Sequence, residues 1–158
     1  MYTSPSRLPE DARREIAAAL DARLADGLDL WSQIKLAHWN VKGPHFAAFH
    51  PLFESFAVGL AAHNDAVAER AVTLGAVVHG TVRQVAIAST LPEYETDAVR
   101  DLDHVRHLAE RFDAYLARVR EARAVAERHQ DQDTVDLLTG IVVEFEKHAW
   151  FLRASLAA

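Results

Sequence analysis

The sequence predicts an all-α protein, a single four-helix bundle in which one long crossover joins the second helix to the third. Alanine, leucine, arginine and glutamate, which favour helices, dominate the chain, whereas glycine and proline occur only 6 and 5 times in 158 residues. Apolar residues recur at helical spacing in four long segments, and no long segment alternates as a strand does. The connection at residues 75–96 is much longer than an ordinary bundle loop.

Residues 1–8 are expected to form a flexible N-terminal tail, and residues 9–158 a single domain, which is long enough to bury a sizeable core. The first helix is predicted to begin at Pro9 or Glu10, because proline suits the first helical position and acidic side chains suit the positive end of a helix. It should end near Asn40. Its buried stripe consists of Ile16, Leu20, Leu24, Leu28, Trp31 and Ile34, and extends to His38.

The second helix follows a turn marked by Gly43 and Pro44, two residues that interrupt helices. It is predicted to begin at residues 45–48 and to end near Gly75, because glycine is a common helix terminator. The long connection that follows is expected to carry a short helix at residues 82–89. A crossing segment of this length makes the second and third helices parallel, unlike those of a simple up-down bundle.

The third helix is predicted to begin after a cap at Thr96 or Asp97 and to end near His129. Asp131 or Asp133 should cap the fourth helix, since an aspartate side chain can accept hydrogen bonds from the first N–H groups of a helix. The inner stripe of the fourth helix consists of Val135, Leu138, Val142, Phe145, Ala149 and Leu152.

Potential metal ligands are dense between His38 and Glu69, within otherwise helical and apolar sequence. His38 lies six residues before Pro44 and His50 six residues after it, so antiparallel flanking helices would bring the two imidazoles side by side. Asp65 and Glu69 are spaced i,i+4, which places both carboxylates on one helix face. The candidate ligands in this stretch are His38, His50, Glu54, His63, Asp65 and Glu69.

One chain cannot bring all of these ligands onto one metal ion. His50 and Asp65 are 15 residues apart, which is roughly 22 Å along a helix at about 1.5 Å per residue, whereas a metal–ligand bond is only about 2 Å long. Two antiparallel copies that cross near the mostly small residues at 57–62 would place His50 of one copy opposite Asp65 of the other, twice across a two-fold axis. The spacing therefore predicts a pair of metal sites across a dimer interface.

Composition excludes several other classes of protein and site. The chain has no cysteine, and therefore no disulfide, thiolate metal site or cysteine nucleophile. Its N-terminus is polar and lacks the apolar segment of a signal peptide, and no apolar run is long enough to span a membrane, so a cytoplasmic location is expected. The net charge of −6 argues against a generally nucleic-acid-binding surface, while a local basic patch remains open.

Three motifs cover the ligand-rich stretch and its surroundings. They are K-x-x-H-W-N-V-K-G-P-x-F at residues 35–46, F-x-x-F-H-x-L-F-E at 46–54 and H-x-D-x-x-A-E-R-A-x-x-L-G at 63–75, and shorter matches lie at 131–139 and 147–152. With these motifs, nearly the whole chain after its N-terminal tail resembles the Dps proteins, the mini-ferritins named as DNA-binding proteins from starved cells.

The resemblance implies a ferritin-like four-helix bundle that assembles from two-fold dimers into a hollow dodecamer. It also implies ferroxidase activity at the dimer interfaces, where Fe(II) is oxidised, preferably by hydrogen peroxide, before ferric iron is stored in the cavity. Two irons per site are expected. Consuming both reagents suppresses hydroxyl-radical chemistry and protects against oxidative damage.

By position, the resemblance assigns His38 and His50 of one subunit, together with the partner subunit's Asp65 and Glu69, to the ferroxidase site. Imidazole and carboxylate ligands suit Fe(II), and a site without thiolates leaves positions for water and oxidant. Zinc is the expected surrogate or inhibitor.

Two further residues are placed beside this site by the resemblance. Glu54 matches a carboxylate that helps to hold a second iron, at a position where the family commonly has aspartate. Trp39 matches a tryptophan next to the site, and we expect it to act as a sacrificial or relaying reductant when only one iron is bound. Packing in a buried environment is the alternative role for Trp39.

Acidic residues near the start of the fourth helix match a region that lines three-fold pores in the family. Asp133 and Asp136 are therefore the candidates for an iron-entry pore, although helix capping and compensation of the helix dipole would also explain such residues. A second acidic and histidine-rich group, on the third helix, is predicted to be a solvated charged face. This group consists of Asp101, Asp103, His104, His107 and Glu110.

Three other titratable residues leave alternatives open. His63 lies on a different helix face from Asp65, where it would orient a ligand or contact another subunit. Glu144 and His148 are spaced i,i+4, which suits either an accessory metal site or, more commonly, a surface pair.

DNA binding is expected to be weak or absent at neutral pH, because strong binding to the phosphate backbone needs several contacts from basic side chains. The only lysines are Lys35, Lys42 and Lys147, and none of them is in a terminal tail. One alternative function is a nucleoid-associated, DNA-binding structural protein whose iron chemistry is incidental. A second alternative is a helical bundle that binds another metal, such as zinc, without turnover.

Overall fold

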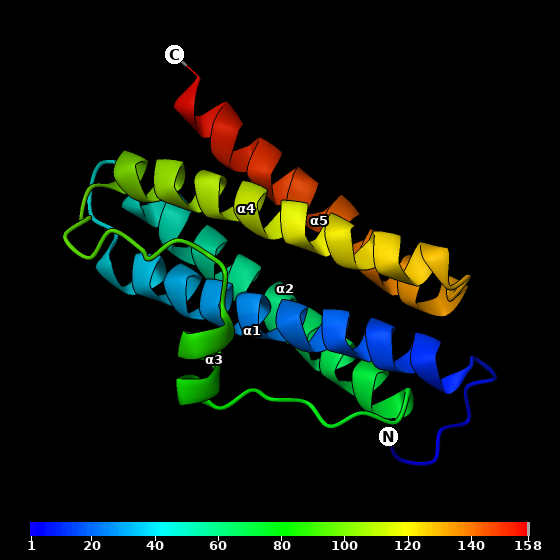
Figure 1. Ribbon diagram of the computed structural model, residues 1–158. Coiled ribbons are helices and arrows are strands. Elements are labelled where there is room, and N and C mark those ends of the chain that lie inside the picture. The colour runs from blue at the N-terminus through cyan, green and yellow to red at the C-terminus, as the bar shows by residue number, and fades with distance from the viewer. Residues whose placement is uncertain (158) are drawn as a thin grey trace.

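The computed structural model describes residues 1–157, in which four long helices form a bundle and a fifth, short helix lies outside it (Figure 1). The helices are α1 (Glu10–Asn40), α2 (Phe46–Thr73), α3 (Val82–Ala88), α4 (Asp101–Arg128) and α5 (Gln132–Leu156).

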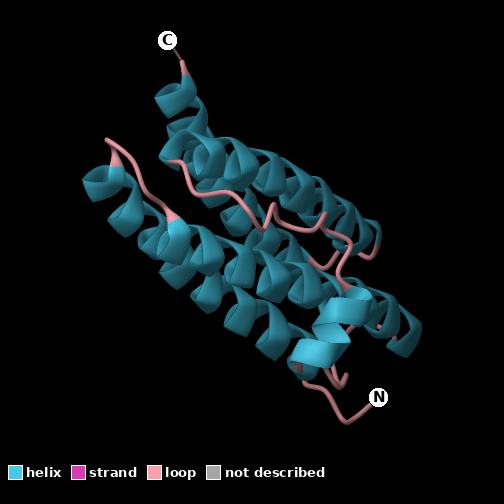
Figure 2. Ribbon diagram, turned by 90° about the vertical axis from the view of Figure 1, so that its left-hand side faces the viewer, coloured by secondary structure: helices cyan, strands magenta, loops and turns pink. Residues whose placement is uncertain are grey.

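The bundle consists of two antiparallel helix pairs, α1 with α2 and α4 with α5, and α1 also packs against α4. The crossover between α2 and α4 runs back along the bundle, so α4 begins at the end where α2 begins, and these two helices are parallel (Figure 1). The long connection in the sequence predicts this topology correctly. Figure 2 shows α3 on the outside of the bundle, where it packs on α1.

A chain of phenylalanines forms the centre of the core. Phe53, Phe56, Phe112 and Phe145 are fully buried, and the rings of Phe112 and Phe145 meet edge to face with centroids 5.2 Å apart. Burying each such side chain contributes about 1.5–3 kcal/mol to folding. In the predicted apolar stripe of α1, Ile16, Leu20, Leu24 and Ile34 are buried, whereas Leu28 is partly buried and Trp31 is exposed.

The start of α4 differs from its prediction, because the helix begins at Asp101 instead of following a cap at residue 96 or 97. Residues just before it pair with the turn between α1 and α2. The Lys42 N–H donates to the Val99 carbonyl at 2.9 Å, and the Asp101 N–H donates to the Lys42 carbonyl, also at 2.9 Å. This pairing holds residues 97–100 out of the helix.

The side chain of Asp101 fixes the same turn. Its carboxylate accepts a hydrogen bond of 2.8 Å from the backbone N–H of His45. Gly43 has φ of +146°, and a Cβ on it would lie 2.5 Å from the Asp101 carboxylate. Glycine is therefore required at position 43 by both the backbone conformation and the available space.

The crossover is anchored to α1 by buried or partly buried aspartates. Asp26, which is fully buried, forms an ion pair of 2.8 Å with Arg23 and accepts the N–H of Thr90 at 2.7 Å. Asp29, nearly one turn later, accepts the hydroxyl of Ser89. These contacts hold the segment after α3 against the bundle.

The N-terminal tail has no helix before Glu10, and it lies beside the C-terminal end of α2. The Tyr2 N–H donates to the Gly75 carbonyl at 2.6 Å, and the Ser4 hydroxyl donates to the Thr73 carbonyl at 2.6 Å. The flexibility of residues 1–8 stays a prediction. None of the described helices combines the length and apolar character that a membrane crossing requires.

Candidate metal centre

The turn between α1 and α2 brings His38 and His50 together at one end of the bundle. Their rings stack with centroids 3.8 Å apart and planes inclined by 23°. The Nδ1 of His38 lies 2.8 Å from the backbone carbonyl of His50, and the Nδ1 of His50 lies 2.9 Å from the carbonyl of His38. The two imidazoles are therefore side by side, as their spacing around Pro44 predicts.

This reciprocal contact fixes the tautomer of both rings. A carbonyl oxygen can only accept a hydrogen bond, so each Nδ1 carries a proton and donates it. The Nε2 of each neutral ring then keeps its lone pair. An imidazole whose second nitrogen donates to a backbone carbonyl is oriented for metal binding through the first.

Glu54 lies next to this pair, one turn after His50 on α2. Its Oε2 is 3.4 Å from the Nε2 of His38 and forms an ion pair with the Nζ of Lys35. The Lys35 hydrogen bond holds the pKa of Glu54 below its usual value, so the carboxylate is charged. In the neutral form of His38, the Nε2 lone pair and this carboxylate together could bind a cation.

Lys35 is a part of the centre that the sequence prediction missed. It lies one turn before His38 on α1, and its ammonium group also sits 5.7 Å from the centre of the Trp39 ring. From the sequence alone, Lys35 had no role in the centre; it was only the first residue of a motif and one of three lysines. Its distance from Glu54 along the chain concealed the ion pair.

Asp65 and Glu69 are not brought to the histidines within one chain. Both are exposed on the outer face of α2, and Trp39 is 64% exposed at the end of α1. Among residues 1–157, no group of three or more His, Cys, Asp or Glu side chains is placed to hold a metal ion. One chain therefore carries two separate parts of the predicted centre.

The outer face of α2 is largely apolar between these two parts. Val58 is 63% exposed, and it is followed along the same face by Ala61, Ala62 and Asp65. Two such faces could pack closely because their side chains are small. Packing of the two faces would bring the histidines of one subunit to the acidic residues of the other. The resulting metal ligands would be imidazole nitrogens and carboxylate oxygens, which suit Fe(II).

A second histidine–carboxylate group connects α2 and α5 inside the chain. The Nε2 of His63 lies 2.8 Å from one oxygen of Glu144, and the Nε2 of His148 lies 3.3 Å from the other. Burial acts to raise the pKa of Glu144, but its hydrogen bonds, chiefly that with His63, lower the pKa below the usual value. Gly59 leaves room for this carboxylate, which a Cβ would approach to 2.7 Å. His148 is largely buried, and so is not a surface residue.

The predicted solvated face of α4 is wrong for two of its five residues. Asp101 and His104 are only 5% and 1% exposed. Together with Val105 and Leu108 they occupy positions i, i+3, i+4 and i+7, which is the inner stripe of a helix. The polar character of Asp101 and His104 concealed this pattern in the sequence.

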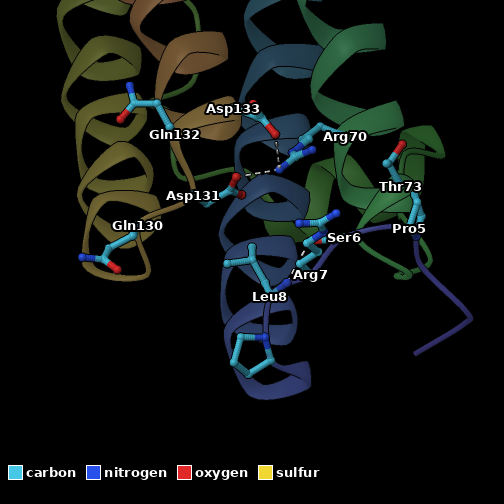
Figure 3. Close-up of a pocket in the computed structure, with 11 residues that line it drawn as sticks. Pro5, Ser6, Arg7, Leu8, Arg70, Thr73, Gln130, Asp131, Gln132 and Asp133 are labelled. Carbon is cyan, nitrogen blue, oxygen red and sulfur yellow. Dashed lines mark hydrogen bonds and ion pairs between the residues drawn. The ribbon is translucent and has the colours of Figure 1, made fainter.

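The aspartates at the start of α5 have different environments. Asp131 caps the helix and is buried, where it forms an ion pair of 2.6 Å with Arg70. Asp133 is exposed 3.9 Å from the same guanidinium group, and Asp136 is also exposed. Figure 3 shows Arg70 between Asp131 and Asp133, beside a pocket of about 550 Å³. The exposed pair remains the candidate for the pore.

A four-helix bundle with one long crossover, and a histidine–carboxylate group between its first two helices, defines the ferritin-like class of protein. The family model described as the ferritin-like domain matches residues 17–158. Within this class, the chain belongs to the Dps family.

Individual relatives support this assignment in sequence and in structure. A DNA protection during starvation protein from Agrobacterium fabrum is 35% identical over 153 residues, which cover 97% of this chain and 94% of that protein. The structure of Mycobacterium smegmatis Dps has a TM-score of 0.94 and 26% identity, covering 100% of this chain and 95% of that one. A Vibrio cholerae Dps, described as a member of a broad superfamily of ferritin-like diiron-carboxylate proteins, has a TM-score of 0.92 and 27% identity, covering 99% and 98%.

Proposed function

We propose that this protein is a ferroxidase that oxidises Fe(II), preferably with hydrogen peroxide, at centres shared between two subunits. The ferric product is stored inside a hollow dodecamer built from two-fold dimers. The observation that carries the proposal is the stacked pair of imidazoles, His38 and His50, whose mutual backbone hydrogen bonds occupy both Nδ1 atoms and leave both Nε2 atoms for metal binding. Fe(II) is the substrate of this centre.

Different residues bind the two Fe(II) ions. His38 and His50 bind one Fe(II), and the partner subunit's Asp65 and Glu69 complete its coordination and neutralise its charge. Glu54 supplies a carboxylate for a second Fe(II). Two Fe(II) ions give up one electron each, so one peroxide is reduced to two hydroxide ions without release of a hydroxyl radical.

The test is anaerobic addition of Fe(II) to the purified protein, followed by one peroxide for every two Fe(II). Ferric absorbance should rise much faster than in buffer alone, and a spin trap should detect little hydroxyl radical. Oxidation no faster than in buffer would contradict the proposal. Tight zinc binding without iron turnover would then favour the alternative of a metal-binding bundle.

Replacing Lys35 with methionine is expected to strengthen binding of the second Fe(II) roughly fivefold. The Lys35 ammonium group competes with that ion for Glu54, and a partly exposed ion pair contributes about 1 kcal/mol. Anaerobic Fe(II) titration measures the effect. Lys42→Met, in the exposed turn, is the control; unchanged or weaker second-site binding in Lys35→Met would show that Lys35 does not compete.

The relatives' names include DNA protection, and iron chemistry can protect DNA without direct contact. The net charge of −6 and the presence of only three lysines, Lys35, Lys42 and Lys147, predict no stable complex with duplex DNA at neutral pH and physiological salt. An electrophoretic shift assay measures this. A nanomolar complex that weakens steeply with added salt would instead favour the nucleoid-binding alternative.

A further inference from the structure

Tyr94 and His104 form a buried hydrogen-bonded pair where the crossover meets the first turn of α4. The Tyr94 hydroxyl lies 2.7 Å from the Nδ1 of His104, and the two residues are 2% and 1% exposed. Their rings are nearly parallel, inclined by 14° with centroids 5.9 Å apart. Within residues 1–157, the Nε2 of His104 is buried without a well-formed hydrogen bond, and the Tyr94 hydroxyl is the side-chain partner of this ring.

The surroundings keep both members of the pair neutral. Burial lowers the pKa of His104, and the nearby charge of His107 lowers it further, against smaller opposing effects of the Asp103 charge and of a hydrogen bond with the Ala98 backbone. Burial also raises the pKa of Tyr94, an effect that the charge of Arg111 only partly offsets. A neutral imidazole accepts the phenolic O–H and can take its proton when the phenol loses an electron.

The pair lies at the same end of the bundle as the candidate metal centre. Asp101, nearly one turn before His104, accepts the backbone N–H of His45 at 2.8 Å. His45 belongs to the turn that joins the helices carrying His38 and His50. A one-electron oxidant formed at the metal centre therefore arises at the end of the bundle where Tyr94 is buried.

We propose that Tyr94 and His104 act as a proton-coupled redox pair that takes up the single oxidising equivalent left when peroxide meets only one Fe(II). The proposal rests on the ferroxidase function. One Fe(II) reduces one peroxide to hydroxide and a hydroxyl radical, and becomes Fe(III). An electron from Tyr94 reduces that oxidant to a second hydroxide, while the phenolic proton moves to the Nδ1 of His104.

The pair is then regenerated by a second Fe(II). This ion returns one electron to the tyrosyl radical, and the proton moves back from His104 to the phenolic oxygen. The balance is two Fe(II) and one peroxide converted to two Fe(III) and two hydroxide ions. This overall reaction is the same as that of a centre with two irons. A centre that holds only one Fe(II) would therefore still avoid releasing a radical.

The chain supplies matched controls, because its three tyrosines have three environments. Tyr2 is 70% exposed, and Tyr115 is as buried as Tyr94. The Tyr115 ring packs on Phe145, and no described histidine is hydrogen-bonded to its hydroxyl. Burial alone and burial with a histidine partner can therefore be compared in the same protein.

The first arm of the test uses no iron. In a Tyr2→Phe background, photogenerated ruthenium(III) tris-bipyridine oxidises the metal-free protein, and electron paramagnetic resonance detects tyrosyl radical. The signal should remain in Tyr115→Phe and disappear in Tyr94→Phe. His104→Gln, which keeps an acceptor but removes the base, should lower the yield at least about tenfold. A signal that persists in Tyr94→Phe, or that is unchanged in His104→Gln, overturns the proposal.

The second arm adds one Fe(II) per centre and then peroxide, followed by freeze-quenching. Ring-deuterated tyrosine distinguishes a tyrosyl radical from a radical on Trp39. We expect a Tyr94 radical that a second Fe(II) removes. Iron oxidation without that radical overturns the coupling to iron, even if the first arm succeeds. If the iron is not oxidised at all, the ferroxidase function and this coupling both fail, and the first arm alone decides whether the redox pair exists.

Discussion

Replacing Asp65 with alanine is expected to slow peroxide-driven Fe(II) oxidation about 100-fold, because it removes a carboxylate ligand from each shared centre. Asp65 is exposed in the single chain, so the substitution should change the stability of the bundle by no more than about 0.5 kcal/mol. Stopped-flow measurement of ferric absorbance gives the rate. Circular dichroism and gel filtration establish that the fold and assembly are retained.

The matched control for this variant is Glu110→Ala, which removes an exposed carboxylate from α4. It lowers the negative charge of the protein by the same amount and should leave the rate unchanged. Equal losses in both variants would indicate a general charge effect on Fe(II) attraction. An unaffected Asp65→Ala variant would remove Asp65 from the centre.

Replacing Asp26 with alanine is expected to destabilise the protein by roughly 3–5 kcal/mol, because it leaves the charge of Arg23 buried without its partner. It also removes the acceptor that holds the Thr90 N–H, so the crossover should detach from α1. Denaturant unfolding measures the stability, and hydrogen exchange at the Thr90 amide measures the detachment.

Asp29→Ala is the control on the same helix. It removes the acceptor of the Ser89 hydroxyl, but no buried guanidinium group loses its partner, so a cost of about 1 kcal/mol is expected. Faster exchange at Thr90 should be specific to Asp26→Ala. Equal costs for the two substitutions would mean that the buried ion pair is not what anchors the crossover.

The elements that the sequence predicted well are those with local signals. Acidic residues at the start and the Gly43–Pro44 turn at the end place α1 within a residue of its observed bounds. The start of α4 was placed too early because the pairing of Lys42 with Val99 and Asp101 joins segments that are distant in the chain. No local pattern encodes that contact.

The candidate site likewise has features that the local sequence predicts and features that depend on contacts between distant segments. The positions of His38 and His50 around a turn sufficed to predict that their rings lie together. The ion pair between Lys35 and Glu54, and the burial of His104, depend on which helix faces meet. These contacts become visible only after the bundle has been assembled.

The most direct test of the central claim is complementation between two inactive variants. His50→Ala and Asp65→Ala chains are co-expressed and the mixed assembly is purified. If each centre combines the histidines of one subunit with the acids of its partner, every mixed dimer has one intact and one doubly defective centre. Random pairing then restores about a quarter of the parent rate. Activity no higher than that of either variant alone would contradict a centre shared between subunits.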